Sequence, residues 1–346
     1  MQPAPPTEAR SDSQMPRTEF ISTGFHVPER VVSNAELTQW WETSDEWIRE
    51  RSGIRERHWV EGGKQAGSDL ALEATRIALE RADMQPGDLD CIIYATLSPD
   101  HFFPGSGVYL QRKLGVPGIP ALDVRNQCTG FLYALSVADG WIRMGQYRRI
   151  LVVGAEVHST GMDFGPAGRD LGVLFGDGAG AVILGPTGDD GRGVLSTHLF
   201  ADGRHAELLW CESDASAHNP RISHEDLDAG RQYPKMQGRD VFRHAVTRMP
   251  ETVKLALETN GLGIADVKLL IAHQANLRIN EMVAKHLGLR EDQVYNNIDR
   301  FGNTTAATIP IAIDECVQAG RLARGDLLIL TAFGSGFTWG SAAIRW

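Results

Sequence analysis

The sequence contains few cysteines, and they lie far apart. Four occur in 346 residues, and no two form a CxxC pair: Cys91, Cys128, Cys211 and Cys316. Zinc sites usually need cysteines a few residues apart, and disulfide frameworks need many in a short chain. We therefore expect neither a metal site nor disulfides, and the usage fits a reducing cytosol.

Long apolar runs and an excess of positive charge are also missing. No stretch approaches the roughly 18 apolar residues of a membrane-spanning helix, and the N-terminus has no signal-peptide core. The net charge of -10 argues against broad affinity for nucleic acid or an anionic membrane. We expect a soluble cytoplasmic protein whose partners are neither nucleic acids nor membranes.

Apolar segments are present, but they are short and alternate in type. Residues 1–16 are rich in proline, serine and charge, and we interpret them as a flexible extension. From Thr18 onward, the periodicity predicts helices and strands in alternation, which is typical of an α/β fold. The predicted helices cover 68–82, 108–114 and 131–144, and the predicted strands cover 89–96 and 149–157.

The same short patterns occur twice in the chain. Ala78-Leu79-Glu80 recurs as Ala256-Leu257-Glu258, and Lys113-Leu114-Gly115 recurs as His286-Leu287-Gly288, at a nearly constant offset. Repetition of this kind indicates two similar halves that share a pseudo-twofold axis.

The offset divides the chain into halves with different chemical groups. We assign residues 17–190 to an N-terminal half that carries a candidate nucleophile, and residues 191–346 to a C-terminal half. Cys128-Thr129 in the first half falls on Asn303-Thr304 in the second. We expect these two positions to be equivalent points near the axis.

Cys128 is the candidate nucleophile. It stands where the apolar run 119–124 meets the predicted helix 131–144. Unpaired N–H groups and the positive end of the helix dipole should favour its thiolate there. Unpaired cysteine is also among the residue types most often buried as small hydrophobes, so that alternative stays open.

Two polar residues of the second half complement this thiol. His273 follows the apolar run 269–272, and Asn303 follows Gly302. Taken singly, each is more often a structural residue or part of a turn. With Cys128 they provide a nucleophile, an imidazole that can donate or accept a proton, and an amide that can donate a hydrogen bond.

Two irregular segments complete the second half. Residues 203–233 are polar, and we predict a long irregular loop that covers a substrate pocket. Its histidines lack metal-ligand spacing. Residues 333–337 form a glycine-rich turn whose backbone N–H groups can approach a ligand. No GxGxxG or GxxxxGK[ST] fingerprint occurs.

The motifs around these residues closely resemble β-ketoacyl-acyl-carrier-protein synthase III, of the thiolase-like superfamily. The resemblance runs from about residue 18 to the C-terminus and implies a five-layered α/β/α/β/α fold of two similar halves, assembled as a homodimer. The motifs that carry it are 43–48, 51–57, 175–180, 273–276, 302–307 and 336–340.

The resemblance implies that Cys128, His273 and Asn303 are catalytic. Cys128 would attack an acyl-CoA, with the oxyanion held by the backbone N–H groups of Cys128 and Ser335. Malonyl-acyl carrier protein would then lose CO₂, and His273 and Asn303 would stabilise the enolate, which attacks the acyl group. This chemistry implies no metal or redox cofactor.

The same resemblance implies a CoA site. Trp47 would stack on the adenine, Arg51 and Arg169 would contact the adenine or phosphate region, and Asn276 would line the pantetheine tunnel. Structural alternatives stay open, because Trp47 could be a helix core residue and both arginines ordinary surface charge.

Two further positions resemble family contacts outside the CoA site. Arg278 matches a position used for carrier-protein docking. Phe103 matches one that crosses the dimer interface and lines the partner's acyl pocket.

Some residues depart from the family pattern, so the resemblance does not identify the substrate. Residues 125–127 are Arg-Asn-Gln where small apolar residues are usual, and Ser335 replaces a glycine. A role in priming a secondary-metabolite pathway is therefore an alternative to fatty acid initiation. A Cys-His-Asn acyltransferase or thioester hydrolase without C–C bond formation is another alternative, and a non-catalytic partner subunit is a third.

Overall fold

The computed structural model describes residues 15–188 and 191–346. The expected flexible extension, residues 1–16, lies outside the described residues apart from its last two. In the part of the chain that the structure describes, no helix combines the length and apolar character that crossing a membrane would require.

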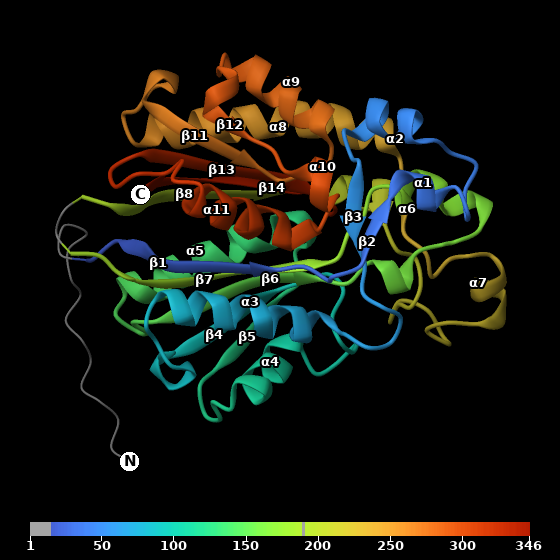
Figure 1. The fold of residues 1–346 in the computed structure, drawn as a ribbon, viewed down its shortest axis with the longest axis horizontal. Helices are drawn as coiled ribbons and strands as arrows, with labels where there is room; N and C mark the ends of the chain where they lie inside the picture. Colours follow the sequence, from blue (N-terminus) through green and yellow to red (C-terminus); the bar gives the residue numbers. More distant parts are fainter. Residues whose placement is uncertain (1–14, 189–190) are drawn as a thin grey trace.

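Two five-stranded sheets form the framework (Figure 1). The first has the order β1-β7-β6-β4-β5, in which β4 is parallel to β5 and β6, and β7 is antiparallel to β1 and β6. Its strands are β1 (Thr18–His26), β7 (Gly178–Pro186), β6 (Ile150–Glu156), β4 (Cys91–Ala95) and β5 (Ala121–Val124).

The second sheet repeats this arrangement. Its order is β8-β14-β13-β11-β12, with the same sequence of antiparallel and parallel pairings. The repeat seen in the sequence therefore reflects two halves of equal topology. The strands are β8 (Gly193–Ala201), β14 (Thr338–Arg345), β13 (Leu327–Gly334), β11 (Val267–Ala272) and β12 (Val294–Tyr295).

Helices form three layers around the two sheets (Figure 1). One pair covers the outer face of the first sheet, one pair covers the outer face of the second, and a central pair separates the sheets. The pairs are α3 (Gly67–Arg81) with α4 (Ser106–Leu114), α8 (Gly238–Thr259) with α9 (Leu277–Leu287), and α5 (Gly130–Arg143) with α11 (Thr308–Gln318). The predicted five-layered α/β/α/β/α fold is confirmed.

Shorter elements connect these layers and border the site. The short helices are α1 (Asn34–Leu37), α2 (Asp45–Ser52), α6 (Arg169–Gly172), α7 (His224–Asp228) and α10 (Ile298–Phe301). The short strands are β2 (Val31–Ser33), β3 (Glu56–His58), β9 (Leu209–Trp210) and β10 (Lys235–Met236).

Strand β6 shows why the predicted strands are continuous apolar runs in the sequence and do not alternate apolar with polar residues. All seven of its residues are buried, because helices cover both faces of the sheet. The predicted strand 149–157 is therefore β6, and the predicted strand 89–96 is β4. The predicted helices match α3, α4 and α5 to within two residues at each end.

The segment 203–233 is more ordered than predicted. It contains a 3₁₀ turn, strand β9, which pairs with β10, and helix α7. Ser223 caps α7 by accepting a hydrogen bond from the Asp226 N–H, and the Asp226 carboxylate accepts one from the Ser223 N–H. The sequence shows this capping box, but the polar composition around it conceals the helix.

Gly154 allows the two halves to approach closely. A Cβ placed on Gly154 in β6 would lie 2.2 Å from the backbone oxygen of Ala306, which belongs to the 3₁₀ turn Thr305–Ala307 of the other half. The 3₁₀ turn therefore packs directly on the strand, and no side chain fits between them.

We predict that Gly154→Ala destabilises the protein by about 3 kcal/mol, at the upper end of overpacking costs, because both clashing groups are backbone. Gly140→Ala is the control, since its Cβ would meet nothing within 4 Å in α5 and alanine favours helix. Urea unfolding of both variants measures the effect. A Gly154→Ala protein as stable as wild type would contradict this packing.

Candidate active site

The candidate catalytic residues of both halves line one cavity of about 730 Å³. Cys128 lies beyond the carboxyl end of β5 and His273 beyond that of β11, while Ser335 follows β13. Asn303 precedes the 3₁₀ turn Thr305–Ala307. All four border the cavity, and carboxyl ends of strands are where α/β sheets place their ligands.

The turn that carries Cys128 has an unusual backbone. Cys128 is the middle residue of a 3₁₀ turn, Gln127–Thr129, that leads directly into α5. Gln127 has φ +46°, a left-handed conformation that few non-glycine residues adopt. This conformation brings the chain from β5 into the helix within a few residues and leaves Cys128 at the cavity wall.

Burial, and not the helix dipole, has the larger effect on the pKa of the Cys128 thiol. Desolvation first, and the charge of Glu156 second, raise the pKa of Cys128 to about 12. The expectation of a favoured thiolate is therefore wrong for this site, because the helix end is too deeply buried for its dipole to compensate. Cys128 needs a base to become a nucleophile.

Two backbone N–H groups point at the thiol. Those of Cys128 and Ser335 hydrogen-bond the sulfur and oppose the rise of its pKa. The approach depends on Gly334, where an added Cβ would lie 3.0 Å from the Cys128 Sγ and 2.7 Å from its Cβ. The Ser335 hydroxyl donates to the Leu209 carbonyl, which joins this turn to the segment 203–233.

His273 is buried and held by one ring nitrogen. Its backbone N–H donates to the Thr331 carbonyl at 2.8 Å, and its Nδ1 lies 2.7 Å from the Thr308 hydroxyl. Its Nε2 makes no hydrogen bond to any described residue. Burial lowers the pKa of His273 to about 3, so the imidazole is uncharged at neutral pH.

Asn303 has a fixed amide orientation. Its Oδ1 accepts a hydrogen bond of 2.9 Å from the Thr305 N–H, which leaves the Nδ2 donors on the other side of the amide. Thr305 has φ +47°, and its hydroxyl lies 2.7 Å from the Nε2 of His158. His158 and Asn303 therefore secure the same strained residue from two directions.

Glu156 joins this turn to the first sheet. Its carboxylate accepts hydrogen bonds from the backbone N–H groups of Leu97, Ser98 and Ala306 and from the hydroxyls of Thr96 and Ser98. Burial raises the pKa of Glu156 to about 7 despite these donors. The carboxyl group thus links the Asn303 turn to the loop that follows β4.

The residues expected to bind CoA lie together at another part of the cavity. The guanidinium groups of Arg51 and Arg169 lie 4.4 and 4.8 Å from the Trp47 ring centroid. Trp47, Arg51 and Asn276 line the cavity, whereas Arg169 reaches it only through Trp47. The Asn276 amide donates to the Arg51 carbonyl at 2.8 Å, which attaches α2 to the start of α9.

Two expected contact residues lie outside the cavity. Phe103 has 78% of its surface exposed, in the loop between β4 and α4. Arg278 is exposed in the first turn of α9. Neither lines the cavity in the single chain.

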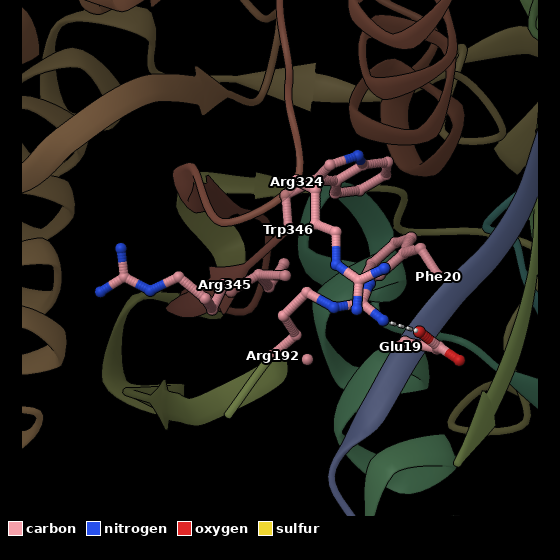
Figure 2. A pocket seen from close by; sticks show the side chains of 8 residues that line it. Glu19, Phe20, Arg192, Arg324, Arg345 and Trp346 are labelled. Atoms are coloured by element: carbon pink, nitrogen blue, oxygen red, sulfur yellow. Dashed lines mark ion pairs between the residues drawn. The ribbon is translucent and has the colours of Figure 1, made fainter. Parts of the chain in front are cut away.

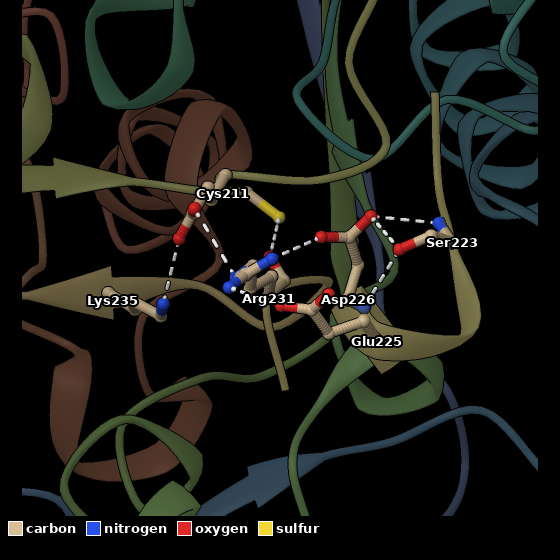
Figure 3. A network of polar contacts seen from close by, with 7 residues as sticks. Cys211, Ser223, Glu225, Asp226, Arg231 and Lys235 are labelled. Carbon is tan, nitrogen blue, oxygen red and sulfur yellow. Dashed lines mark hydrogen bonds and ion pairs between the residues drawn. The ribbon is translucent and has the colours of Figure 1, made fainter. Parts of the chain in front are cut away.

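The segment 203–233 covers part of the cavity, as its position suggested. Leu209, Trp210, Cys211 and Gln232 line the cavity wall. Figure 3 shows a polar network within this segment, in which Arg231 contacts Asp226 at 2.6 Å. The Cys211 thiol also donates a hydrogen bond to the Ser213 carbonyl at 2.8 Å. These contacts hold the covering segment in a defined shape.

A second cavity, of about 130 Å³, lies beside the C-terminal residue (Figure 2). Arg192 pairs there with Glu19 at 3.1 Å, and Phe20 packs against Trp346 with ring centroids 5.3 Å apart. None of the residues lining it is a cysteine, serine or histidine, so it lacks a candidate for the chemistry of the larger cavity.

Sequence reasoning missed the residues that hold the site together: Glu156, His158, Thr305 and Thr308. Glu156 and His158 lie at the end of the predicted strand 149–157, at the same sheet edge as Cys128. Polar residues at that edge were a usable signal. The two threonines gave none, since hydroxyl contacts depend on packing.

Comparison with known proteins identifies relatives over nearly the whole chain. Residues 122–203 match the family described as 3-oxoacyl-[acyl-carrier-protein (ACP)] synthase III, and residues 257–346 match its C-terminal part. The β-ketoacyl-[acyl-carrier-protein] synthase III of Xanthomonas campestris pv. campestris is 46% identical over 94% of this chain and 98% of its own.

Solved structures agree with this similarity. The 3-oxoacyl-[acyl-carrier-protein] synthase III of Aquifex aeolicus has a TM-score of 0.86 and 38% identity, covering 95% of this chain and 100% of its own. The priming β-ketosynthase of the R1128 polyketide biosynthetic pathway has a TM-score of 0.87 and 30% identity, covering 98% of both chains.

The buried imidazole of His273 predicts a pH-dependent stability. Its pKa is about 3 in the folded chain and near 6.5 in the unfolded chain, so only the unfolded chain gains a proton between these values. The contribution of His273 to stability therefore falls as the pH falls through 6.5. Between pH 7 and pH 5, wild type should lose about 2 kcal/mol more free energy of unfolding than His273→Gln.

Denaturant unfolding at both pH values measures this difference. His224→Gln, at an exposed position, is the control and should follow wild type. Equal losses in wild type and His273→Gln would show that the imidazole is not buried in its neutral form.

Proposed function

This chain belongs to the β-ketoacyl-[acyl-carrier-protein] synthase III family and is a condensing acyltransferase of that type, and we propose that Cys128, His273 and Asn303 carry its reaction. The observation that supports this assignment most strongly is the surroundings of Cys128. It lines the large cavity, receives two backbone N–H groups at its sulfur, and shares the cavity wall with an imidazole whose Nε2 has no partner among the described residues.

In the first half-reaction, Cys128 is acylated. The Nε2 of His273 takes the thiol proton, and the sulfur attacks the thioester carbonyl of acyl-CoA. The backbone N–H groups of Cys128 and Ser335 stabilise the oxyanion of the tetrahedral intermediate. Collapse of the intermediate expels CoA as its thiolate, which takes a proton from water.

In the second half-reaction, malonyl-acyl carrier protein loses CO₂ to give an enolate. The Nε2–H of His273 and the Nδ2–H of Asn303 donate hydrogen bonds to the enolate oxygen. The enolate carbon attacks the acyl group on Cys128, and collapse releases β-ketoacyl-acyl carrier protein. The departing sulfur recovers its proton from His273. These steps balance with protein groups and substrates, so we propose no metal or redox cofactor.

The proposed CoA site is the group around Trp47. Arg51 and Arg169 supply cations for the phosphates. The Trp47 indole supplies an aromatic face for the adenine, and one of the two guanidinium groups that now lie over this ring would move away when the adenine binds. Asn276 lines the path from there to Cys128, where the pantetheine would lie.

The cavity of this chain has polar residues next to the nucleophile, and these bear on which acyl donor it accepts. Arg125 and Gln127, which replace the small residues usual in the family, both border the cavity. We propose either initiation of fatty acid synthesis or priming of a related secondary-metabolite pathway. The similarity to a synthase III and to a priming β-ketosynthase supports both.

We also propose a homodimer. Strand β5 is an edge strand of the first sheet and pairs only with β4 among the described strands, so its outer side can pair with a second copy. The exposed Phe102 and Phe103 lie in the loop that follows β4 and would be covered in such a dimer. The free cysteines of the described chain favour a reducing compartment, and we propose the cytoplasm.

The first experiment measures intact-protein mass after incubation with a panel of acyl-CoAs. Wild type should gain one acyl group, and Cys128→Ala should gain none. Cys211→Ala is the matched control, because this second thiol also lines the cavity, and it should be acylated like wild type. Addition of malonyl-acyl carrier protein should remove the acyl group as a β-ketoacyl product.

Other outcomes would favour the alternatives. Discharge of the adduct to free acid without a malonyl substrate would indicate a thioester hydrolase. No adduct with any donor would indicate a non-catalytic partner subunit. Acylation that survives Cys128→Ala but not Cys211→Ala would place the nucleophile on the covering segment.

The proposed docking role of Arg278 gives a second test. An exposed cation beside the CoA end of the cavity would attract a negatively charged face of acyl carrier protein, and charge reversal would repel it. Arg278→Glu should raise the KM for malonyl-acyl carrier protein about tenfold while leaving acylation by acyl-CoA unchanged. Lys285→Glu, an exposed position in the last turn of the same helix, is the control. An equal loss in both half-reactions would refute the docking role.

A further inference from the structure

The proposed reaction requires opposite behaviour from one nitrogen atom. The Nε2 of His273 must accept the proton of Cys128 during acylation, and it must donate a hydrogen bond during decarboxylation. A neutral imidazole carries one proton, so the nitrogen that holds this proton at rest decides which step can occur first.

The contacts of Thr308 determine where that proton lies. The Thr308 hydroxyl is 2.7 Å from the Nδ1 of His273 and 3.0 Å from the Thr305 carbonyl oxygen. A hydroxyl has one proton, and a carbonyl oxygen can only accept. Both contacts are hydrogen bonds at the same time only if Thr308 donates to Thr305 and His273 donates to Thr308 from Nδ1.

Thr305 is held where its carbonyl oxygen can accept this hydrogen bond. Its hydroxyl contacts His158 at 2.7 Å, its N–H donates to Asn303 at 2.9 Å, and its backbone has φ +47°. The atoms of these contacts are buried or partly buried, so water competes little with them. A series of hydrogen bonds therefore runs from His158 through Thr305 and Thr308 to the ring of His273.

We propose that Thr308 is a positioning residue that keeps the resting proton of His273 on Nδ1, so that Nε2 is a proton acceptor until Cys128 has been acylated. This inference rests on the proposed function and deepens it. It assigns an order to the two half-reactions: acylation places a proton on Nε2, and that proton then serves decarboxylation.

The proton balance through the cycle is closed. Acylation moves the thiol proton to Nε2, so the imidazolium donates from Nδ1 to Thr308 and from Nε2 toward the substrate. CoA leaves as a thiolate and is protonated by water. Decarboxylation transfers the electron pair of the broken C–C bond to the enolate, and condensation expels the Cys128 thiolate. That thiolate takes back the Nε2 proton.

Three variants separate this role from simple packing. Thr308→Val keeps the shape but removes the hydroxyl, and Thr308→Ser restores it. Thr304→Val is the matched control, because Thr304 is a buried threonine on the other side of the turn Thr305–Ala307, and its hydroxyl has no hydrogen-bond partner among the described residues. A packing defect would affect the two valine variants alike.

The first readout is the protonation state of the ring, measured by nitrogen-15 NMR of histidine-labelled protein at neutral pH. The His273 signals are identified by their loss in His273→Gln. Wild type should show a protonated Nδ1 and an unprotonated Nε2, and Thr308→Val should shift toward a protonated Nε2. A wild-type ring protonated at Nε2 would overturn the proposal, whether or not the enzyme condenses any substrate.

The second readout is the rate of acylation by acyl-CoA. Thr308→Val should slow acylation about 10- to 100-fold, because the imidazolium loses the acceptor of its Nδ1–H. Condensation by the fully acylated variant should fall less, and Thr308→Ser should recover most of the rate. Equal loss in Thr308→Val and Thr304→Val, or none in either, would overturn the proposal. A wild type that is never acylated would instead reject the proposed function.

Discussion

The backbone contact between Gly154 and Ala306 is the constraint on which the site depends. It brings the turn after Asn303, from the second half, directly onto strand β6 of the first half, with no side chain between them. Glu156, two residues along the same strand, hydrogen-bonds the Ala306 N–H and the loop after β4. The position of Asn303 relative to Cys128 therefore follows from how closely the two sheets approach through the central helix layer.

Burial then sets the chemistry. Desolvation raises the pKa of the Cys128 thiol to about 12 and lowers that of His273 to about 3, so both groups are neutral at neutral pH. Desolvation also raises the pKa of Glu156 to about 7, so this carboxyl group is only partly ionised. Reactivity has to arise when substrate binds, by proton transfer between groups that hydrogen bonds already hold in place.

Duplication of the fold explains why one cavity can carry two half-reactions. The halves share a strand order, and α5 and α11 lie together between the sheets, so the start of one central helix presents Cys128 and the approach to the other presents Asn303. Strand β11 adds His273 from the second sheet. The covering segment 203–233 breaks this symmetry, and it leaves the cavity asymmetric around the nucleophile.

The sequence by itself predicted α/β organisation and two similar halves, and the resemblance of its motifs implied the five-layered fold and the candidate residues Cys128, His273 and Asn303. Hydrophobic periodicity and motifs are local properties that a single chain displays directly. Only the tertiary structure decided that Cys128 rests as a thiol, because desolvation depends on neighbours from both halves. It alone brought Thr308 to His273, since a hydroxyl finds its partner through packing between segments that sequence spacing does not place.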